Sequence, residues 1–224
     1  MSDEKICFIV PVFNEEDTIS TVINEIKSLG NVKIIVIDDC STDRTSEIIS
    51  NLDVICIRHE NNMGYDFSLN TGFKKAYELD MNFAITIDAD GQHHLEDAKK
   101  IIDLLLKGNS IVKGNRKLLP RLSEKIYSIY TKTFYDISDP LCGLKGYSLK
   151  DCKNFEILNP NNMIGTRVLL NCKRNKLQIA DFEIKEVNRF GLSRYGGSFK
   201  ANLKIFIILA SLIFTDILRL LRIK

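Results

Sequence analysis

Four short apolar runs recur between residues 6 and 87, and polar segments separate them. In chain order they read ICFIVPV, VKIIVI, DVICIR and FAITI, and β-branched residues are frequent in them. Runs of this length and composition are typical of buried strands. Because apolar residues occupy successive positions, we expect both faces of each strand to be covered, as in a parallel sheet.

Segments with helical periodicity lie between these strands. Apolar residues from Ile19 to Ile26 predict a first helix, which Asn14 would cap and Asp17 would help to start. Ser41 is predicted to open a second helix, and residues 67–79 supply a third. Strands that alternate with helices predict an α/β fold with a mostly parallel central sheet and helices on both faces.

The second half of the chain is less regular. Residues 95–108 predict an amphipathic helix, and residues 110–115 predict a fifth strand. The segment 139–148 is expected to turn into a further strand and a helix start, and residues 177–187 partly alternate like a half-buried strand. We predict one catalytic domain over residues 1–198 and a C-terminal helix over residues 199–224.

Polar segments follow each of the four apolar runs, at the point where each strand ends. They read FNEE, DDCSTD, HENNMG and DADGQHH. In parallel α/β sheets, ligands bind beyond the carboxyl ends of the strands. We therefore expect these four loops to meet at one edge of the sheet and to form the functional site.

Composition and charge narrow the class of protein. The chain has 224 residues, a hydrophobic fraction of 45% and a formal net charge of +2, which favours a globular domain and no nucleic-acid partner. The six cysteines show no CxxC spacing, so we expect reduced thiols in a cytosolic setting. The opening MSDEKICFIV indicates no targeting peptide.

Two carboxylates one residue apart, Asp88 and Asp90, follow the fourth run and precede Gly91. One interpretation is a local turn in which the acids accept hydrogen bonds from backbone amides. The other is a site for a hard cation such as Mg²⁺ or Mn²⁺, which oxygen ligands suit. The second acidic loop, at Asp38 and Asp39, favours the cation.

Seven motifs occur in a characteristic order, and they cover nearly the whole chain. They read PVFNEE (11–16), DDCSTDRT (38–45), NNMG (61–64), DADGQH (88–93), GNR (114–116), DPLCGLKGYS (139–148) and RFGLSRYG (189–196). In this order they resemble the family 2 glycosyltransferases, and most closely the polyprenyl-phosphate sugar synthases.

The resemblance implies a GT-A fold, a nucleotide-diphosphate sugar donor, and Mg²⁺ or Mn²⁺ as cofactor. The implied metal ligands are Asp88, Asp90 and Gln92, and His93 would touch a phosphate or the metal shell. The implied donor-binding residues are Pro11, Phe13, Asn14, Glu15, Asp38, Asp39, Asn62, Gly64 and Asp88.

Two departures from the family pattern concern the donor. Phe13 stands where the family usually has Tyr, so stacking is kept and a hydroxyl is lost. Tyr65, Asp66 and Phe67 replace the cation and the small residues of relatives, and we expect them to add bulk near the nucleotide. We identify no partner for His59.

Basic residues follow the fifth strand, and they form either a solvated face or a clamp for a phosphate of the acceptor. The resemblance implies that Arg116 and Arg121 bind a lipid phosphate, and that Arg189 and Arg194 lie on a loop that closes over the substrates. A phosphate acceptor is already anionic and requires no general base, whereas a hydroxyl acceptor would require one. For that case Asp139 is the candidate, with a turn before Pro140 as its structural alternative. The predicted catalytic residues are thus Asp90, Arg116 and Asp139.

The C-terminal segment combines a long apolar run with polar interruptions. The run from Ile205 to Leu218 is shorter than the roughly 20 residues that span a bilayer. A polar stripe from Lys204 to Arg222 predicts an interfacial helix on a membrane surface. The alternative is a helix that packs on the catalytic domain or on a second copy in a homo-oligomer.

The resemblance implies an inverting, metal-dependent transferase at the cytoplasmic face of the membrane, which moves a hexose onto polyprenyl phosphate. The alternatives are a transferase with a glycan hydroxyl as acceptor and, more remotely, a non-catalytic membrane-docked binding module. A sugar-nucleotide pyrophosphorylase would need an early Gly-rich basic loop, and a NAD-dependent oxidoreductase would need G-x-G-x-x-G. IVPVFNEED has neither.

Overall fold

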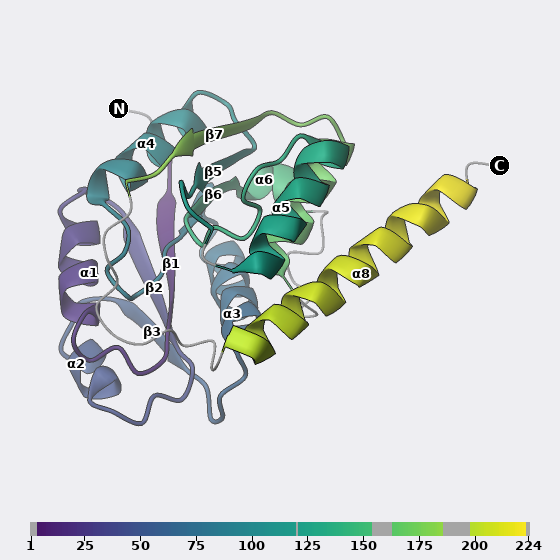
Figure 1. Ribbon diagram of the computed structural model, residues 1–224. Helices are drawn as coiled ribbons and strands as arrows, with labels where there is room; N and C mark the ends of the chain where they lie inside the picture. The colour runs from purple at the N-terminus through teal and green to yellow at the C-terminus, as the bar shows by residue number, and fades with distance from the viewer. Residues whose placement is uncertain (1–3, 120, 154–162, 186–197, 223–224) are drawn as a thin grey trace. The chain divides into compact units, whose positions relative to one another are not determined.

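The computed structural model describes residues 4–119, 121–153, 163–185 and 198–222 (Figure 1). A seven-stranded sheet with the order β3-β2-β1-β4-β6-β5-β7 forms its centre. All neighbouring pairs are parallel except those of β6, which runs antiparallel to β4 and β5. The mostly parallel α/β sheet is thus confirmed. The strands are β1 (Ile6–Val12), β2 (Lys33–Asp38), β3 (Ile55–Arg58), β4 (Phe83–Thr86), β5 (Ile111–Asn115), β6 (Lys145–Ser148) and β7 (Ile179–Glu183).

Helices cover both faces of the sheet. Phe8 and Val10 belong to a core that β1 shares with α1 and α4. On the opposite face Ile9 meets α3 at Gly72, where an added Cβ would lie only 2.3 Å from Ile9 Cγ2, so glycine permits this close approach. The helices are α1 (Ile19–Lys27), α2 (Thr45–Ser50), α3 (Tyr65–Glu78), α4 (Leu95–Leu106), α5 (Leu122–Tyr135), α6 (Leu149–Cys152), α7 (Ile164–Arg174) and α8 (Ser198–Arg222).

Strand β3 differs from the expectation that both faces are covered. It lies at the edge of the sheet, and its residues alternate between half-buried Ile55 and Ile57 and exposed Cys56 and Arg58. The side chains of Cys56 and Arg58 therefore face solvent, and this face of the strand is not covered.

The two predicted helix caps are wrong. Helix α1 begins at Ile19, well beyond Asn14, whose Oδ1 instead accepts a hydrogen bond from Thr42 N (2.8 Å). Helix α2 begins at Thr45, and Ser41 lies in the preceding turn. Both side chains serve contacts between loops, which a local capping pattern does not reveal.

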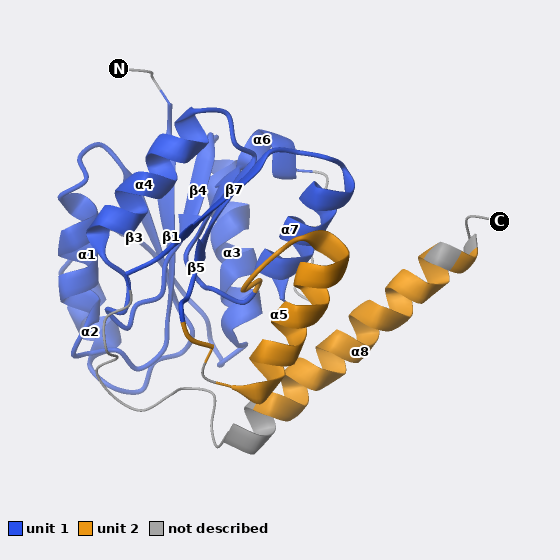
Figure 2. Cartoon of the chain, turned by 45° about the horizontal axis from the view of Figure 1, so that its top comes forward, with its two compact units in different colours: residues 1–117, 141–190 blue, residues 118–140, 191–224 orange. Residues whose placement is uncertain are grey.

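The chain forms two compact units (Figure 2). The first comprises residues 1–117 and 141–190 and contains the sheet, and the second comprises residues 118–140 and 191–224 and contains α5 and α8. The expected boundary after residue 198 stays a prediction. No helix in the described ranges combines the length and the apolar character needed to cross a membrane.

Within the second unit, polar contacts join α8 to α5. Both carboxylate oxygens of Asp216 accept hydrogen bonds, one from the hydroxyl of Tyr130 (2.8 Å) and one from that of Tyr135 (2.5 Å). At the start of α8, Asn202 Oδ1 accepts a hydrogen bond from Ser123 N (3.1 Å). The acid that interrupts the apolar run therefore holds the two helices together.

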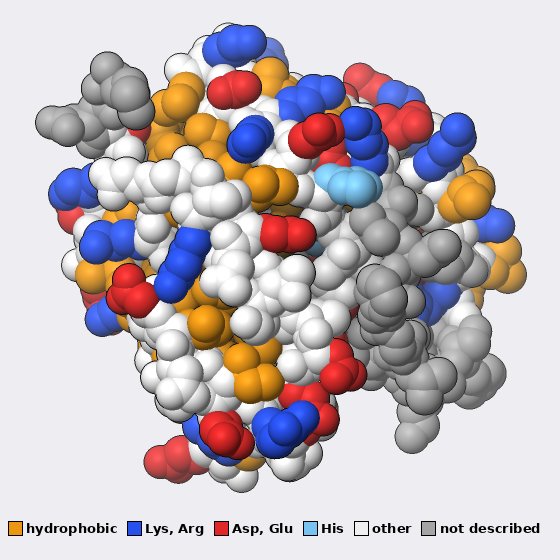
Figure 3. Space-filling view, turned by 90° about the vertical axis from the view of Figure 1, so that its left-hand side faces the viewer, with side chains coloured by type: hydrophobic (Ala, Val, Ile, Leu, Met, Phe, Trp, Pro, Cys, Tyr) orange, Lys and Arg blue, Asp and Glu red, His pale blue; other side chains and the backbone are white. Residues whose placement is uncertain are grey.

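Charged side chains are mixed on the face that Figure 3 shows. Basic and acidic side chains lie interspersed among its described residues, without an extended area of one sign. This distribution agrees with the small net charge of the chain, +2.

Candidate active site

Hydrogen bonds join the loops that follow the first four strands. Asn14 N donates to Ser41 Oγ (3.1 Å), and Glu15 N donates to Thr45 Oγ1 (2.8 Å), which ties the first loop to the second. The Thr18 hydroxyl donates to Ala89 O (2.7 Å), which ties the first to the fourth. The parallel register of β3, β2, β1 and β4 places all these loops at the same edge of the sheet, as predicted (Figure 1).

Asp39 holds the third loop. Its buried carboxylate accepts hydrogen bonds from Met63 N (2.8 Å) and Gly64 N (2.7 Å), and His59 Nδ1 lies 2.8 Å from Oδ1. A positive φ of 89° at Gly64 lets the backbone turn toward this carboxylate. The segment before α3 is thus fixed through one side chain on the second loop.

His59 has a structural partner on each ring nitrogen. Nδ1 bonds Asp39, and Nε2 lies 2.9 Å from the hydroxyl of Thr71 on α3. Sequence reasoning missed both partners. The signal lies in the strand register, because Asp38 pairs with Arg58 and the residues that follow them are therefore neighbours.

Asp38 is buried and satisfied within its own turn. Oδ1 accepts a hydrogen bond from Ser41 N (2.8 Å), Oδ2 accepts one from the Ser46 hydroxyl, and Arg58 Nε lies 3.7 Å from Oδ2. These contacts stabilise the turn between β2 and α2. The donor-binding role of Asp38 stays a prediction.

The other predicted donor-binding residues lie at the same edge. Pro11 is buried near the end of β1, Phe13 is half-buried just beyond it, and Glu15 is buried 3.0 Å from the Thr18 hydroxyl. Asn14 and Asn62 are exposed on the first and third loops. They lie at the end of the sheet, and their donor-binding roles stay predictions.

Asp88, just beyond β4, is held from two sides. The Tyr65 hydroxyl donates to Oδ1 (3.0 Å), and His93 Nε2 lies 3.6 Å from Oδ2. Gly143 packs against the same carboxylate, because an added Cβ there would lie 2.4 Å from Oδ2. Two segments distant in the sequence, at Tyr65 and Gly143, and His93 of the same loop thus define the position of this acid.

The pKa of the Asp88 carboxyl lies below its ordinary value. Burial by itself raises this pKa, whereas the contacts with His93 and with the Tyr65 hydroxyl and the charge of Lys145 lower it further than burial raises it. Asp88 is therefore an ionised carboxylate at neutral pH, which is the form that binds a hard cation.

Asp90 is buried in the turn that follows. Its Oδ1 accepts a hydrogen bond from Gln92 N (3.2 Å), two residues on, and Gly91 between them has a φ of 72°. The turn that we considered as the structural alternative is therefore present. This hydrogen bond is compatible with a second role for Asp90, because a carboxylate has several lone pairs.

The residues present fit a divalent cation that binds together with the phosphates of a substrate. Asp88, Asp90 and Gln92 offer oxygen donors within five residues, and Asp88 is ionised. Among the residues whose placement is described, no group of three or more His, Cys, Asp or Glu side chains is arranged to hold a metal ion. Mg²⁺ typically uses one or two carboxylates and takes its other ligands from substrate phosphates and water, so such a closed cage is not required.

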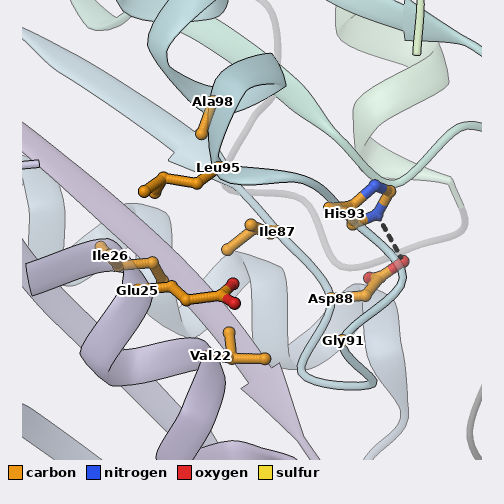
Figure 4. Close-up of a pocket in the computed structure, with 9 residues that line it drawn as sticks. All are labelled: Val22, Glu25, Ile26, Ile87, Asp88, Gly91, His93, Leu95 and Ala98. Carbon is orange, nitrogen blue, oxygen red and sulfur yellow. Dashed lines mark ion pairs between the residues drawn. The ribbon is translucent and has the colours of Figure 1, made fainter. Parts of the chain in front are cut away.

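A small pocket lies next to Asp88, between α1 and the segment that leads into α4 (Figure 4). Its lining is mostly apolar, with Val22 and Ile87 among its residues, and its volume is about 10 Å³. This space holds about one water molecule and is too small for a nucleotide sugar. His93, which also lines it, has a buried Nδ1 that no group in the described part of the chain hydrogen-bonds, so a water molecule there would satisfy it.

The predicted acceptor residues belong to different parts of the chain. Arg116 is half-buried just after β5 in the first unit. Arg121 and Asp139 belong to the second unit, where the Arg121 guanidinium lies 2.5 Å from Glu124 Oε1 and Asp139 is buried. Arg189 and Arg194 lie outside the described residues. The acceptor-binding roles of all four arginines stay predictions.

Comparison with known proteins shows the family of this chain. Residues 7–136, more than half of the chain, match the family described as Glycosyl transferase family 2. The UDP-N-acetylglucosamine--dolichyl-phosphate N-acetylglucosaminyltransferase of Methanococcus voltae is 30% identical over 92% of this chain and 95% of its own length. The dolichol-phosphate mannosyltransferase of Pyrococcus furiosus is 29% identical over 74% of this chain and 51% of its own.

Solved structures show the same fold. Glucosyl-3-phosphoglycerate synthase from Mycobacterium tuberculosis, in complex with Mn²⁺, uridine diphosphate and glucosyl-3-phosphoglycerate, superimposes with a TM-score of 0.69. The similarity covers 92% of this chain and 80% of that one, at 18% sequence identity. The expected GT-A architecture is thereby confirmed.

Proposed function

This chain belongs to glycosyl transferase family 2, and from this membership we propose that it moves a hexose from a nucleotide-diphosphate sugar to polyprenyl phosphate. The transfer would invert the anomeric carbon and take place at the cytoplasmic face of the membrane. The observation that carries the proposal is the ionised Asp88, held at the edge of the sheet where four loops meet. Relatives named for transfer to dolichyl phosphate support the acceptor.

Each part of the site has a role in this proposal. The loops around Phe13, Glu15 and Asp39 would bind the nucleoside, and Asp88, Asp90 and Gln92 would hold Mg²⁺ or Mn²⁺. Such an ion stabilises the negative charge that develops on the diphosphate leaving group. The structure of glucosyl-3-phosphoglycerate synthase, which has the same fold, contains Mn²⁺ and uridine diphosphate and supports this choice of cofactor.

The acceptor requires binding more than activation. A phosphate monoester is anionic near neutral pH, so no side chain has to remove a proton from it. Arg116, Arg121, Arg189 and Arg194 would bind its oxygens, because a guanidinium matches phosphate geometry. Arg116 is thus the proposed catalytic residue on the acceptor side.

A second candidate function is transfer to a glycan hydroxyl, and one observation favours it. Asp139 is a buried carboxylate with a φ of 38°, a backbone conformation that is rare for residues other than glycine. Strained residues of this kind concentrate at functional sites. In this alternative Asp139 would be the general base.

The acceptor can be tested with labelled donors. Purified protein, Mn²⁺ and radiolabelled UDP- or GDP-sugars are incubated with polyprenyl phosphate, with a glycan acceptor, or with neither. We expect label in the lipid only when polyprenyl phosphate is supplied. Label in the glycan alone would favour the second candidate. Donor binding without transfer or hydrolysis under any condition would instead indicate a non-catalytic binding module.

The second unit offers a surface for the membrane. Helix α8 packs on α5 with one face, and the opposite face carries a stripe of apolar side chains. These side chains are 50–69% exposed, and they are Leu203, Ile207, Phe214 and Leu221. Leu122 and Ile129 on α5 are each 66% exposed. Lys204 and Arg219 flank the stripe on α8, and this charge favours anionic lipid over a second copy of the chain.

We expect the protein to sediment with vesicles that contain anionic phospholipid and to be released by high salt. Phe214→Glu should lower the bound fraction several-fold, because a charge at the centre of the stripe must stay in water. Ser211→Glu adds the same charge within the polar stripe and should have a smaller effect. Equal binding of both variants, or a dimer whose dissociation requires Phe214→Glu, would refute the membrane surface.

A further inference from the structure

One of the side chains that depart from the family pattern contacts the predicted metal ligand directly. Tyr65 is the first residue of α3, and its hydroxyl donates to Asp88 Oδ1 at 3.0 Å. Bulk at this position was expected to crowd the nucleotide. In the structure the ring instead brings a hydrogen-bond donor to the carboxylate.

The position of Tyr65 is fixed from both of its neighbours. Gly64 N donates to Asp39 Oδ2 at 2.7 Å, so the residue before Tyr65 is bound to the second loop. On the other side, Asp66 Oδ1 accepts a hydrogen bond from Ile164 N (3.1 Å) at the start of α7. Since both neighbours are held, the tyrosine ring starts from a defined backbone position.

This arrangement links two subsites. Asp39, which is proposed to bind the base, holds Gly64, and the next residue holds Asp88, which is proposed to bind the metal. The second oxygen of Asp88 lies 3.6 Å from His93 Nε2. In the described part of the chain, Tyr65 thus contacts one oxygen of the carboxylate and His93 the other, and these two residues come from different segments.

A carboxylate that is oriented in advance binds a cation more tightly than one that rotates freely. Hydrogen-bond partners of metal ligands set ligand orientation, and their loss typically lowers metal affinity by about 10- to 100-fold. The Tyr65 hydroxyl has the geometry for this role, because it donates to one oxygen of Asp88 and leaves that oxygen a further lone pair.

We propose that Tyr65 is a positioning residue, whose hydroxyl aligns the Asp88 carboxylate for the divalent ion and the donor diphosphate. This inference rests on the proposed function. It assigns to the tyrosine a part in metal affinity and none in chemistry on the sugar. Its effect should therefore disappear when the metal is in large excess.

The test compares Tyr65→Phe with Tyr77→Phe. Both changes remove one hydroxyl from α3, and that of Tyr77 bonds Leu149 O (3.1 Å) away from the site. Mn²⁺ is titrated into each protein with UDP and, in a separate arm, with GDP, and free Mn²⁺ is followed by electron paramagnetic resonance. We expect Mn²⁺ affinity to fall about 10- to 100-fold in Tyr65→Phe and to stay unchanged in Tyr77→Phe.

Two further readouts separate positioning from a structural role. The Mn²⁺ concentration for half-maximal transfer should rise in Tyr65→Phe by the same factor, whereas kcat at saturating Mn²⁺ should stay close to the wild-type value. The melting temperature without metal should be equal to that of Tyr77→Phe within a few degrees. A large loss of metal-free stability with unchanged Mn²⁺ affinity would overturn the inference.

Failure of this inference differs from failure of the proposed function. If wild-type protein binds Mn²⁺ with a nucleotide and Tyr65→Phe binds it equally well, only the positioning role is wrong. If wild-type protein binds no Mn²⁺ with either nucleotide, the metal site itself is wrong, and the inference falls with it.

Discussion

Replacement of Asp88 by asparagine is expected to lower the rate of sugar transfer by about 10²- to 10³-fold and to leave the protein folded. The change removes one negative charge from the proposed metal site at nearly constant shape. A cation that stabilises the leaving group contributes several kcal/mol, and each 1.36 kcal/mol corresponds to a tenfold change in rate, hence about this loss. The measurement is kcat with labelled donor at saturating Mn²⁺.

The fold should tolerate this substitution. An asparagine Oδ1 still accepts the hydrogen bond from the Tyr65 hydroxyl, and the amide keeps the contact with Gly143 that a larger side chain would disrupt. Asp97→Asn is the matched control. Asp97 is buried, whereas Asp88 is half-buried, and Asp97 accepts its hydrogen bond from Lys185 N (3.0 Å), away from the loops. Retention of more than half of the activity in Asp88→Asn would exclude Asp88 from catalysis.

Replacement of Asp39 by alanine is expected to cost about 3–5 kcal/mol of unfolding free energy, the largest stability loss among these predictions. The carboxylate satisfies two backbone amides and one imidazole at once. Its removal would leave Met63 N, Gly64 N and His59 Nδ1 without this acceptor, and a buried donor without a partner costs about 1–3 kcal/mol. Urea denaturation followed by circular dichroism measures the change.

Two further variants test this prediction, one with an intermediate expected effect and one as a control. Asp39→Asn keeps one acceptor oxygen and should fall between alanine and wild type. Glu78→Ala removes an exposed carboxylate that pairs with Lys75 at the end of α3, and it should change stability little. If Asp39→Ala were as stable as Glu78→Ala, the third loop would not depend on this carboxylate.

The positions of the strands, and the acidic residues in the loops that follow them, were predictable from the sequence. Apolar runs at residues 6–12 and 83–87 correspond closely to β1 and β4, because local patterning alone sets strand position. The rule for parallel sheets then placed Asp39 and Asp88 at one edge, and the hydrogen bonds between loops confirm that placement. The pairing of β6 as an antiparallel strand was not predictable in this way, since direction depends on the connection.

The sequence-based predictions were wrong or incomplete where a polar side chain could form either a local or a distant hydrogen bond. Asn14 and Ser41 have the composition of helix caps, yet the Asn14 amide oxygen bonds Thr42 and the Ser41 hydroxyl accepts from Asn14 N. In the sequence, Asp216 only interrupts an apolar helix, whereas in the structure it accepts hydrogen bonds from two tyrosine hydroxyls of α5. Each of these bonds joins residues that are at least 27 positions apart.

The amino-acid sequence by itself determined which segments are strands and helices and which loops carry acids, because neighbouring residues set backbone preference and periodicity. Only the tertiary structure decided which donor meets which acceptor. Tyr65 reaches Asp88, and Gly64 reaches Asp39, because strand order and register bring the third loop beside the second and the fourth. A buried carboxylate takes the nearest donors in space, and distance in space depends on the packing of the whole sheet rather than on the residues beside it in the chain.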